Sequence, residues 1–281
     1  MVKRKAGLAC CSNGIHPDKA QRIEALQNLL LQIGIETVRS ECMFSDTPWG
    51  HGDGKARADA LMQFYNDPSV TEIYDVSGGD LANEILPYLD YPLIATAAKP
   101  FWGYSDLTVI LNAVYAKTGR EGVLYQVRNL LASDLAREEF DGECLFDIPV
   151  SFLRGSAMEG IVLGGNIRCF LKLAGTEYFP DLTGKILLLE ANGGEATQMI
   201  TYLNQLRQLG AFEKVSGILL GTFTKMEMTG ARPTMEELVL QMVPGELPVA
   251  KTYFVGHGID SRAVRIGGFY RFDQVKYRER I

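Results

Sequence analysis

Ser105 stands where an apolar, aromatic stretch ends at Gly103 and an amphipathic segment, 107–117, begins. A serine at a sharp strand-to-helix turn exposes its hydroxyl, and the free backbone N–H groups of the new helix can stabilise an oxyanion. The pattern is related to the nucleophile elbow, with Leu107 in place of the usual final glycine. The pair Ser105-Asp106 is equally typical of a simple helix N-cap, so the rest of the chain has to decide between the two.

His257 is the second residue suited to chemistry. It follows an apolar stretch and is flanked by Gly256 and Gly258, which leave room for another surface to approach the ring. Histidine is the side chain whose proton affinity suits base catalysis near neutral pH. A loop histidine with one satisfied hydrogen bond would show the same pattern. Of the other two histidines, His16 lies where a helix is capped and His51 lies in a glycine-rich loop, so both are weaker candidates.

Glu190 closes the apolar run 187–189 and precedes a loop, 191–195. Strands often end in an acid simply because the chain emerges into water. However, Ser105, Glu190 and His257 follow one another in the order in which α/β-hydrolases place nucleophile, acid and base. This order predicts acyl transfer, in which His257 takes the proton of Ser105, Glu190 orients the imidazolium, and backbone N–H groups hold the oxyanion.

The first half of the chain alternates between apolar and amphipathic runs. These runs predict strands at 6–11, 35–38 and 71–76 and helices at 17–33, 55–66, 81–88 and 107–117. The alternation predicts right-handed βαβ units and a mostly parallel sheet, which is an α/β fold. Ligands gather at the carboxyl ends of such strands, where both Gly78-Gly79 and Ser105 fall.

The second half repeats the alternation after a change in character. The charged stretch 128–158 has no clear period and predicts a connector between an N-terminal domain, 1–127, and a C-terminal domain, 159–281. Further strands are predicted at 160–163, 185–189, 215–220 and 248–255, helices at 167–174 and 196–209, a glycine-rich loop at 47–54, and a closing hairpin at 263–275.

Composition narrows the classes of function. The net charge is -6, from 34 acidic and 28 basic residues, and no long basic run occurs, so nucleic acid is not an expected partner. Five scattered cysteines without a C-x-x-C pair predict a reducing compartment rather than disulfides or a zinc site. The apolar run 6–11 is too short for a signal peptide, and no run approaches the ~18 residues of a membrane span. We therefore expect a cytoplasmic protein.

Competing sites have less support in the sequence. The chain has no P-loop and no G-x-G-x-x-G after its first strand, and short pairs such as Gly164-Gly165 more often serve turns than phosphates. The three histidines do not cluster, so neither a metal nor another cofactor is expected. Cys10-Cys11 is interpreted as a buried structural pair, because no basic or histidine neighbour would lower the thiol pKa.

Six segments together resemble the LD-carboxypeptidase family of serine peptidases, which includes murein LD-carboxypeptidases and microcin-C immunity peptidases. The resemblance as a whole extends from the first strand to the last predicted hairpin. The segments are 103–108 (GYSDLT), Gly78-Gly79 with 86–91 (LPYLDY), Gly164-Gly165-Asn166, Leu188-Leu189-Glu190, 215–221 (VSGILLG) and Gly256-His257-Gly258.

The resemblance implies a Ser-Glu-His triad, carried by Ser105, Glu190 and His257. It also implies an oxyanion hole from the backbone N–H of Asp106 and of the pair Gly78-Gly79, most plausibly Gly79. A flavodoxin-like N-terminal domain, a smaller swivelling α/β C-terminal domain, a site between them and a homodimer follow from the same resemblance. Metal is not part of the family's mechanism.

Departures from the family pattern leave the substrate open between two kinds. Many murein-type members have Arg-Gly-Gly-Tyr where this chain has residues 77–80 (SGGD), and a Gly-Pro where it has 125–127 (YQV). Residues 115–119 and 212–217 resemble the immunity peptidases more closely, yet the connector is shorter than is usual in those peptidases. The substrate is therefore expected to be a murein tetrapeptide or, alternatively, a peptidyl or aminoacyl-nucleotide conjugate. A catalytically silent relative that binds a peptide as a sensor is the alternative from another class.

Overall fold

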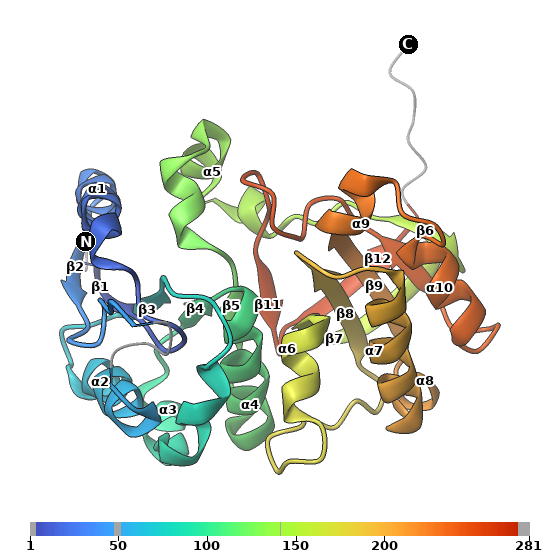
Figure 1. Cartoon of the computed structure of the whole chain (residues 1–281), viewed down its shortest axis with the longest axis horizontal. Helices are drawn as coiled ribbons and strands as arrows, with labels where there is room; N and C mark the ends of the chain where they lie inside the picture. The colour runs from blue at the N-terminus through green and yellow to red at the C-terminus, as the bar shows by residue number, and fades with distance from the viewer. Residues whose placement is uncertain (1–3, 48–51, 141, 275–281) are drawn as a thin grey trace.

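The computed structural model describes residues 4–47, 52–140 and 142–274. Part of the predicted glycine-rich loop, including His51, lies outside the described residues. The described residues form two six-stranded sheets, each covered by helices (Figure 1). The expected α/β class is confirmed.

The first sheet has the strand order β2-β1-β3-β4-β5, all parallel, with β11 added antiparallel beside β5. The order 2-1-3-4-5 is that of flavodoxin-like folds, as the resemblance implied. Ala6 and Leu8 of β1 cluster with helix α1, whereas Ala9 clusters with α2, because successive side chains of a strand point to opposite faces. The strands are β1 (Arg4–Ala9), β2 (Ile35–Arg39), β3 (Glu72–Asp75), β4 (Phe101–Gly103), β5 (Gly122–Leu124) and β11 (Val264–Ile266).

The second sheet has four parallel strands, β7-β8-β9-β10, between two antiparallel edge strands, β12 and β6. Its central strand β8 is buried along its whole length, which explains the unbroken run Leu187-Leu188-Leu189. The strands are β6 (Ser151–Arg154), β7 (Ala157–Asn166), β8 (Ile186–Ala191), β9 (Gly217–Phe223), β10 (Val249–Lys251) and β12 (Phe269–Asp273).

The helices largely match the predicted segments. Pro87 interrupts the predicted helix 81–88, which forms a 3₁₀ helix, Ala82–Tyr88. The α-helices are α1 (Ala20–Gln32), α2 (Gly54–Asn66), α3 (Tyr91–Ala97), α4 (Thr108–Thr118), α5 (Asp134–Glu139), α6 (Ile167–Phe170), α7 (Ala196–Gln208), α8 (Ala211–Lys214), α9 (Thr224–Thr229) and α10 (Met235–Met242). None of the described helices has the length and apolar character needed to cross a membrane.

The end of the chain departs from the prediction. The segment 263–275 does contain two strands, but it is not a hairpin: β11 pairs with β5 of the first sheet and β12 pairs with β7 of the second. The segment 248–255 forms a strand only at Val249–Lys251. His257 therefore lies on a loop that leaves β10 in one sheet and reaches β11 in the other. The connector 128–158 contains α5 and also β6, an edge strand of the second sheet. The domain boundaries at 127 and 159 stay predictions.

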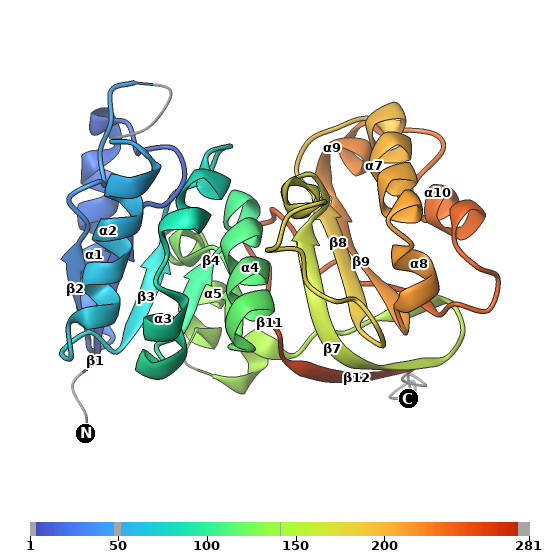
Figure 2. The ribbon, with the colours of Figure 1, turned by 90° about the horizontal axis from the view of Figure 1, so that it is seen from below.

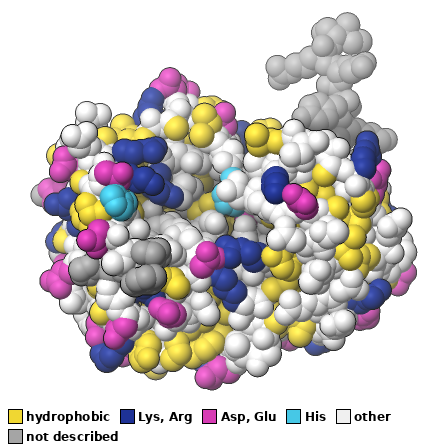
Figure 3. Space-filling view, in the orientation of Figure 1, with side chains coloured by type: hydrophobic (Ala, Val, Ile, Leu, Met, Phe, Trp, Pro, Cys, Tyr) yellow, Lys and Arg dark blue, Asp and Glu magenta, His cyan; other side chains and the backbone are white. Residues whose placement is uncertain are grey.

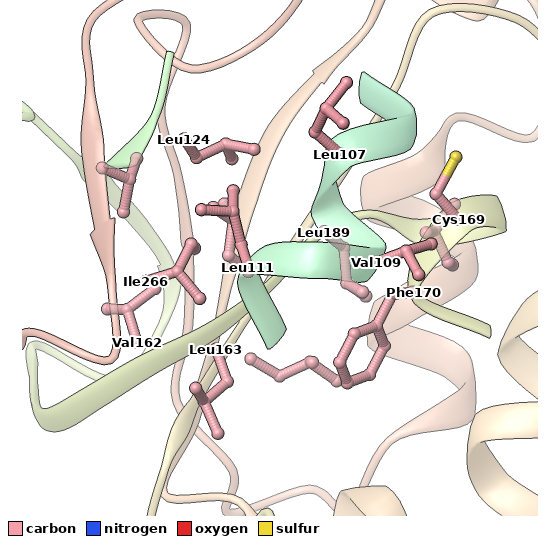
Figure 4. Close-up of a cluster of buried hydrophobic side chains, with 14 of the residues drawn as sticks. Leu107, Val109, Leu111, Leu124, Val162, Leu163, Cys169, Phe170, Leu189 and Ile266 are labelled. Atoms are coloured by element: carbon pink, nitrogen blue, oxygen red, sulfur yellow. The ribbon is translucent and has the colours of Figure 1, made fainter. Parts of the chain in front are cut away.

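Helix α4, which follows Ser105, lies between the two sheets (Figure 2). Its side chains from Thr108 to Val114 are all buried. One hydrophobic cluster runs from α4 into both halves and includes Leu111 of the helix, Val162 of β7 and Ile266 of β11 (Figure 4). Swivelling of the C-terminal domain stays a prediction.

Two polar contacts fix α4 against β7. Asn112 donates to the carbonyl of Gly164 at 2.9 Å and accepts from the Gly164 N–H at 2.8 Å, while the Asn166 N–H donates to the Thr108 hydroxyl at 3.1 Å. Gly165 has a φ of +129°, and a Cβ there would lie 2.8 Å from the Thr108 Oγ1. The glycine pair 164–165 was expected to serve a turn. Instead it lies inside β7 and lets the helix approach the strand.

Candidate active site

Ser105 lies at the turn between β4 and α4 with a φ of +56°. Only Ala98 shares such a positive φ among the described non-glycine residues. A left-handed conformation at a serine is strained, and such strain persists where the surrounding structure imposes it. The hydroxyl is half-buried and lines a cleft rather than closing the helix as a cap: no cap hydrogen bond is made by a side chain at the start of either Ser105–Leu107 or α4.

Glu190 and His257 form a close pair. The carboxylate is completely buried near the end of β8, and its Oε2 lies 2.8 Å from Nδ1 of His257, whose side chain is 16% exposed. Because a carboxylate oxygen accepts, Nδ1 carries the proton and donates. The other ring nitrogen, Nε2, is then a free acceptor, and it has no partner among the described residues. This is the tautomer that a general base requires.

The loop of His257 is held against β9. The Thr222 N–H donates to the Val255 carbonyl at 2.8 Å, and a Cβ on Gly256 would lie 1.6 Å from the Thr222 Oγ1. Only glycine permits this approach, which brings the imidazole to the buried carboxylate of Glu190.

Tyr104 connects the nucleophile turn to the Glu190–His257 pair. Its hydroxyl donates to Glu190 Oε2 at 3.2 Å and lies 3.5 Å from His257 Nδ1, and the two rings contact edge to face with centroids 4.8 Å apart. Burial, reinforced by the charge of Glu190, raises the pKa of Tyr104 well above its ordinary value, so the hydroxyl remains a donor. We did not single out Tyr104 from the sequence. Its position directly before the serine was the available signal.

The loop of Gly78 and Gly79 is fixed next to this turn. Asn13 forms an isolated bridge with Gly78, and its Oδ1 accepts from the Asp80 N–H at 2.7 Å. Arg168 of α6 donates to the Gly79 carbonyl at 3.2 Å and pairs with the Asp80 carboxylate, which lowers the pKa of Asp80.

The side chain of Asp106 is buried, and its carboxylate already accepts hydrogen bonds from other parts of the chain. It accepts from the Ser12 hydroxyl at 2.6 Å, the Ala82 N–H at 2.9 Å and the Lys172 ammonium at 2.5 Å. The carboxylate thus ties the nucleophile turn to both halves of the chain, and only the backbone N–H of Asp106 remains a candidate for contact with a substrate.

Two cavities meet at Ser105 and Asn192. We call them the histidine arm, about 270 Å³, and the glycine arm, about 350 Å³. The histidine arm is lined further by Gly78, Tyr104, Arg128, Asn129 and His257, and the glycine arm by Gly79, Asp80, Asn166, Arg168 and Tyr202. Figure 3 shows this face hollowed between the two halves, with basic side chains gathered on either side.

The other residues considered as candidates in the sequence have structural roles in the fold. Cys10 and Cys11 are buried, and burial raises the pKa of both thiols, so they stay protonated. His16 accepts from the Asp18 N–H and caps the turn at Pro17–Lys19, as expected. Within the described part of the chain, no group of three or more His, Cys, Asp or Glu side chains is arranged to hold a metal ion.

Comparison with known proteins gives consistent matches over both halves. Residues 6–126 match the LD-carboxypeptidase N-terminal domain, and residues 159–272 match the LD-carboxypeptidase C-terminal domain. The microcin C7 self-immunity protein MccF of Escherichia coli is 26% identical over 249 residues, which cover 73% of this chain and 72% of that protein. The murein tetrapeptide carboxypeptidase of Pseudomonas aeruginosa (PAO1) is 26% identical over 234 residues, which cover 75% of each chain.

A solved structure of MccF in complex with glutamyl sulfamoyl guanosine superimposes with a TM-score of 0.87 at 21% identity, covering 97% of this chain and 94% of that one. At this identity the likeness shows the shared fold. The two domain matches show the family as well as the fold, because the N-terminal and C-terminal domains of one family follow one another along this chain. The chain belongs to the LD-carboxypeptidase family and is a peptidase.

Proposed function

We propose that the protein is a serine carboxypeptidase that hydrolyses the L,D amide bond of a murein tetrapeptide and releases D-alanine. The observation that carries the proposal is the 2.8 Å contact between Glu190 and His257, which leaves Nε2 of that ring without a partner among the described residues, while His257 and Ser105 line the same cavity. A nucleophile and a base that line one cavity, with a buried acid in contact with the base, are the parts that acyl transfer needs.

The proposed reaction has two halves. Ser105 Oγ attacks the amide carbon while its proton moves to Nε2 of His257, and the C–N bond then breaks as that proton passes to the departing amine. Water next attacks the acyl-enzyme, gives a proton to His257, and the ester bond to Ser105 breaks as its oxygen recovers that proton. Glu190 stabilises the imidazolium in both halves, and the backbone N–H groups of Asp106 and Gly79 are proposed to hold the oxyanion.

A murein tetrapeptide is the proposed substrate because a relative named for that activity is similar over 75% of its own length and of this chain. An aminoacyl-nucleotide conjugate is the second candidate. It is favoured by the ligand in the MccF structure and by a further cavity that continues from the histidine arm and leaves room for a larger departing group. The homodimer and the cytoplasmic location stay predictions.

Labelling tests the nucleophile independently of the substrate. A serine-reactive fluorophosphonate is expected to modify Ser105 in the folded protein, as read by mass spectrometry of the labelled peptide. Absence of labelling in folded protein would favour a silent, peptide-binding relative.

Two substrates tested in parallel separate the two hydrolase functions. The protein is incubated with a murein tetrapeptide and with an aminoacyl-sulfamoyl adenosine, and the loss of each is followed by chromatography. Faster loss of the tetrapeptide supports the proposed activity, and faster loss of the conjugate supports the second candidate.

A further inference from the structure

Arg128 is a half-buried cation on the histidine arm without a carboxylate partner among the described residues. Its Nε donates to Gln126 Oε1 at 3.0 Å, and the same oxygen accepts from its backbone N–H at 3.2 Å. These contacts fix the plane of the guanidinium. The terminal nitrogens, Nη1 and Nη2, have no acceptor in the described part of the chain, although they are the pair that binds a carboxylate or phosphate in a bidentate manner.

No carboxylate among the described residues forms an ion pair with this cation. The charge of Asp75 acts on it at longer range, but the Asp75 oxygens make their hydrogen bonds to the Cys11 N–H and to the N–H and hydroxyl of Ser77. Burial, and then the positive charge of Arg22, lowers the pKa of Arg128 despite Asp75. Arginine nevertheless remains protonated at neutral pH, so an anion placed here would gain a strong partner.

The glycine arm provides a contrast. Its arginine, Arg168, is already paired with Asp80 and donates to the Gly79 carbonyl. Among the described residues, the guanidinium groups of Arg128 and Arg168 line the cleft, and that of Arg128 is the one without a carboxylate partner.

The chemistry assigns the two arms to two parts of the substrate. His257 must give its proton to the departing amine, so the departing group lies on the side of Ser105 where His257 lies. That side is the histidine arm, which also contains Arg128. The acyl part then occupies the glycine arm.

We propose that Arg128 is a specificity-determining residue that binds a negative charge on the departing group of the substrate. The inference rests on the proposed hydrolase function and names the chemistry of one substrate end. In a carboxypeptidase substrate this charge is the free α-carboxylate of the released residue. In a nucleotide conjugate it is a phosphate, for which the adjoining cavity of about 290 Å³ adds Arg22 and Lys19.

The test compares substrates that differ only in the charge of the departing group. One pair is a tetrapeptide ending in D-alanine and its C-terminal amide; the other is an aminoacyl phosphoramidate of adenosine and its phosphate methyl ester. A hydrogen-bonded charge pair discriminates by about 10- to 100-fold. The wild type should prefer the charged member of at least one pair by that factor in kcat/KM, and Arg128→Gln should reduce the preference to less than about threefold by slowing the charged member.

Two variants serve as controls. Arg128→Lys should keep part of the preference, because the charge remains without the planar fork. Arg168→Gln should slow both members of a pair together and leave their ratio unchanged. Thermal unfolding checks that each variant is folded.

The outcomes separate this inference from the function on which it rests. Loss of preference for the tetrapeptide acid identifies a carboxylate, and loss for the phosphoramidate identifies a phosphate. An unchanged ratio in folded Arg128→Gln, or equal rates for both members in the wild type, would overturn the role of Arg128 while leaving the hydrolase intact. Failure of the wild type to cleave any of the four compounds or to be labelled at Ser105 would instead reject the hydrolase.

Discussion

The two halves of the molecule supply the candidate site by different physical means. The N-terminal half presents Ser105 through its backbone, at a left-handed turn between a three-residue strand and a buried helix. The C-terminal half presents Glu190 and His257 through side-chain contacts, with a buried carboxylate 2.8 Å from an imidazole. The proposed nucleophile thus depends on local strain, whereas the proposed proton-transfer pair depends on burial. Four substitutions test this comparison. Two remove Ser105 or Glu190, one on each side, one changes the packing of the halves at Gly165, and one changes Tyr104, which links them.

The largest effect is expected from Ser105→Ala. Removal of the nucleophile should lower kcat by about 10⁴- to 10⁶-fold, since members of such a unit act together. Ser156→Ala changes an exposed serine outside both arms and should keep wild-type kinetics. A loss below tenfold at position 105 would show that the left-handed turn does not present the nucleophile.

Glu190→Gln should lower kcat by about 10²- to 10⁴-fold with the shape of the side chain conserved. An amide can donate to Nδ1 and so favours the wrong imidazole tautomer, and removal of the charge leaves the imidazolium without its partner. Fluorophosphonate labelling followed over time measures the loss at the acylation step alone. Undiminished labelling would mean that the buried carboxylate only supports the fold.

Gly165→Ala tests the boundary between the halves. An alanine there must adopt a φ of +129° and place its Cβ 2.8 Å from the Thr108 Oγ1, so we expect a loss of about 2–3 kcal/mol in the free energy of unfolding. Denaturant titration measures this change. Gly175→Ala is the matched control, because Gly175 also has a positive φ, +79°, but nothing lies within 4 Å of an added Cβ. Equal losses in the two variants would show that close packing of α4 on β7 contributes nothing beyond backbone strain.

Tyr104→Phe tests the link between the two halves and should have the smallest effect. The variant keeps the ring against His257 but loses the hydroxyl that donates to Glu190, so kcat should fall about 3- to 10-fold with KM unchanged. Because the pKa of Tyr104 is raised well above 10, the wild-type residue stays protonated, and the ratio of the two rates should be constant between pH 6 and 9. A ratio that varies across this range would show that Tyr104 exchanges protons and does not merely position its neighbours.

Local patterns predicted most of the fold and the three proposed catalytic residues. Ser105 and His257 could be singled out because glycines and apolar strands next to them are short-range signals. The pairing of β11 with β5 could not be predicted, since a three-residue strand contains no information about a partner 140 residues earlier in the chain. Glu190 was expected as the orienting acid at a strand end, but its complete burial could not be predicted, because residues far away in the sequence cover it.

The functional candidate Arg128 likewise could not be predicted from local sequence patterns. It belongs to a charged stretch without periodicity, which predicted a connector and gave no sign of a cavity. Only the folded chain brings it to the cleft that also contains Ser105 and His257, and only there is it evident that no described carboxylate forms an ion pair with it.

The loop that contains His257 is anchored at one end by β10 and at the other by β11, which belong to different sheets. Within the loop, however, Val255 and Gly256 are held against β9 of the second sheet, the sheet that also contains Glu190. A change in the angle between the sheets would therefore carry His257 along with Glu190 and alter the distance of both from Ser105. Proton transfer from Ser105 would then depend on the closed arrangement of the halves.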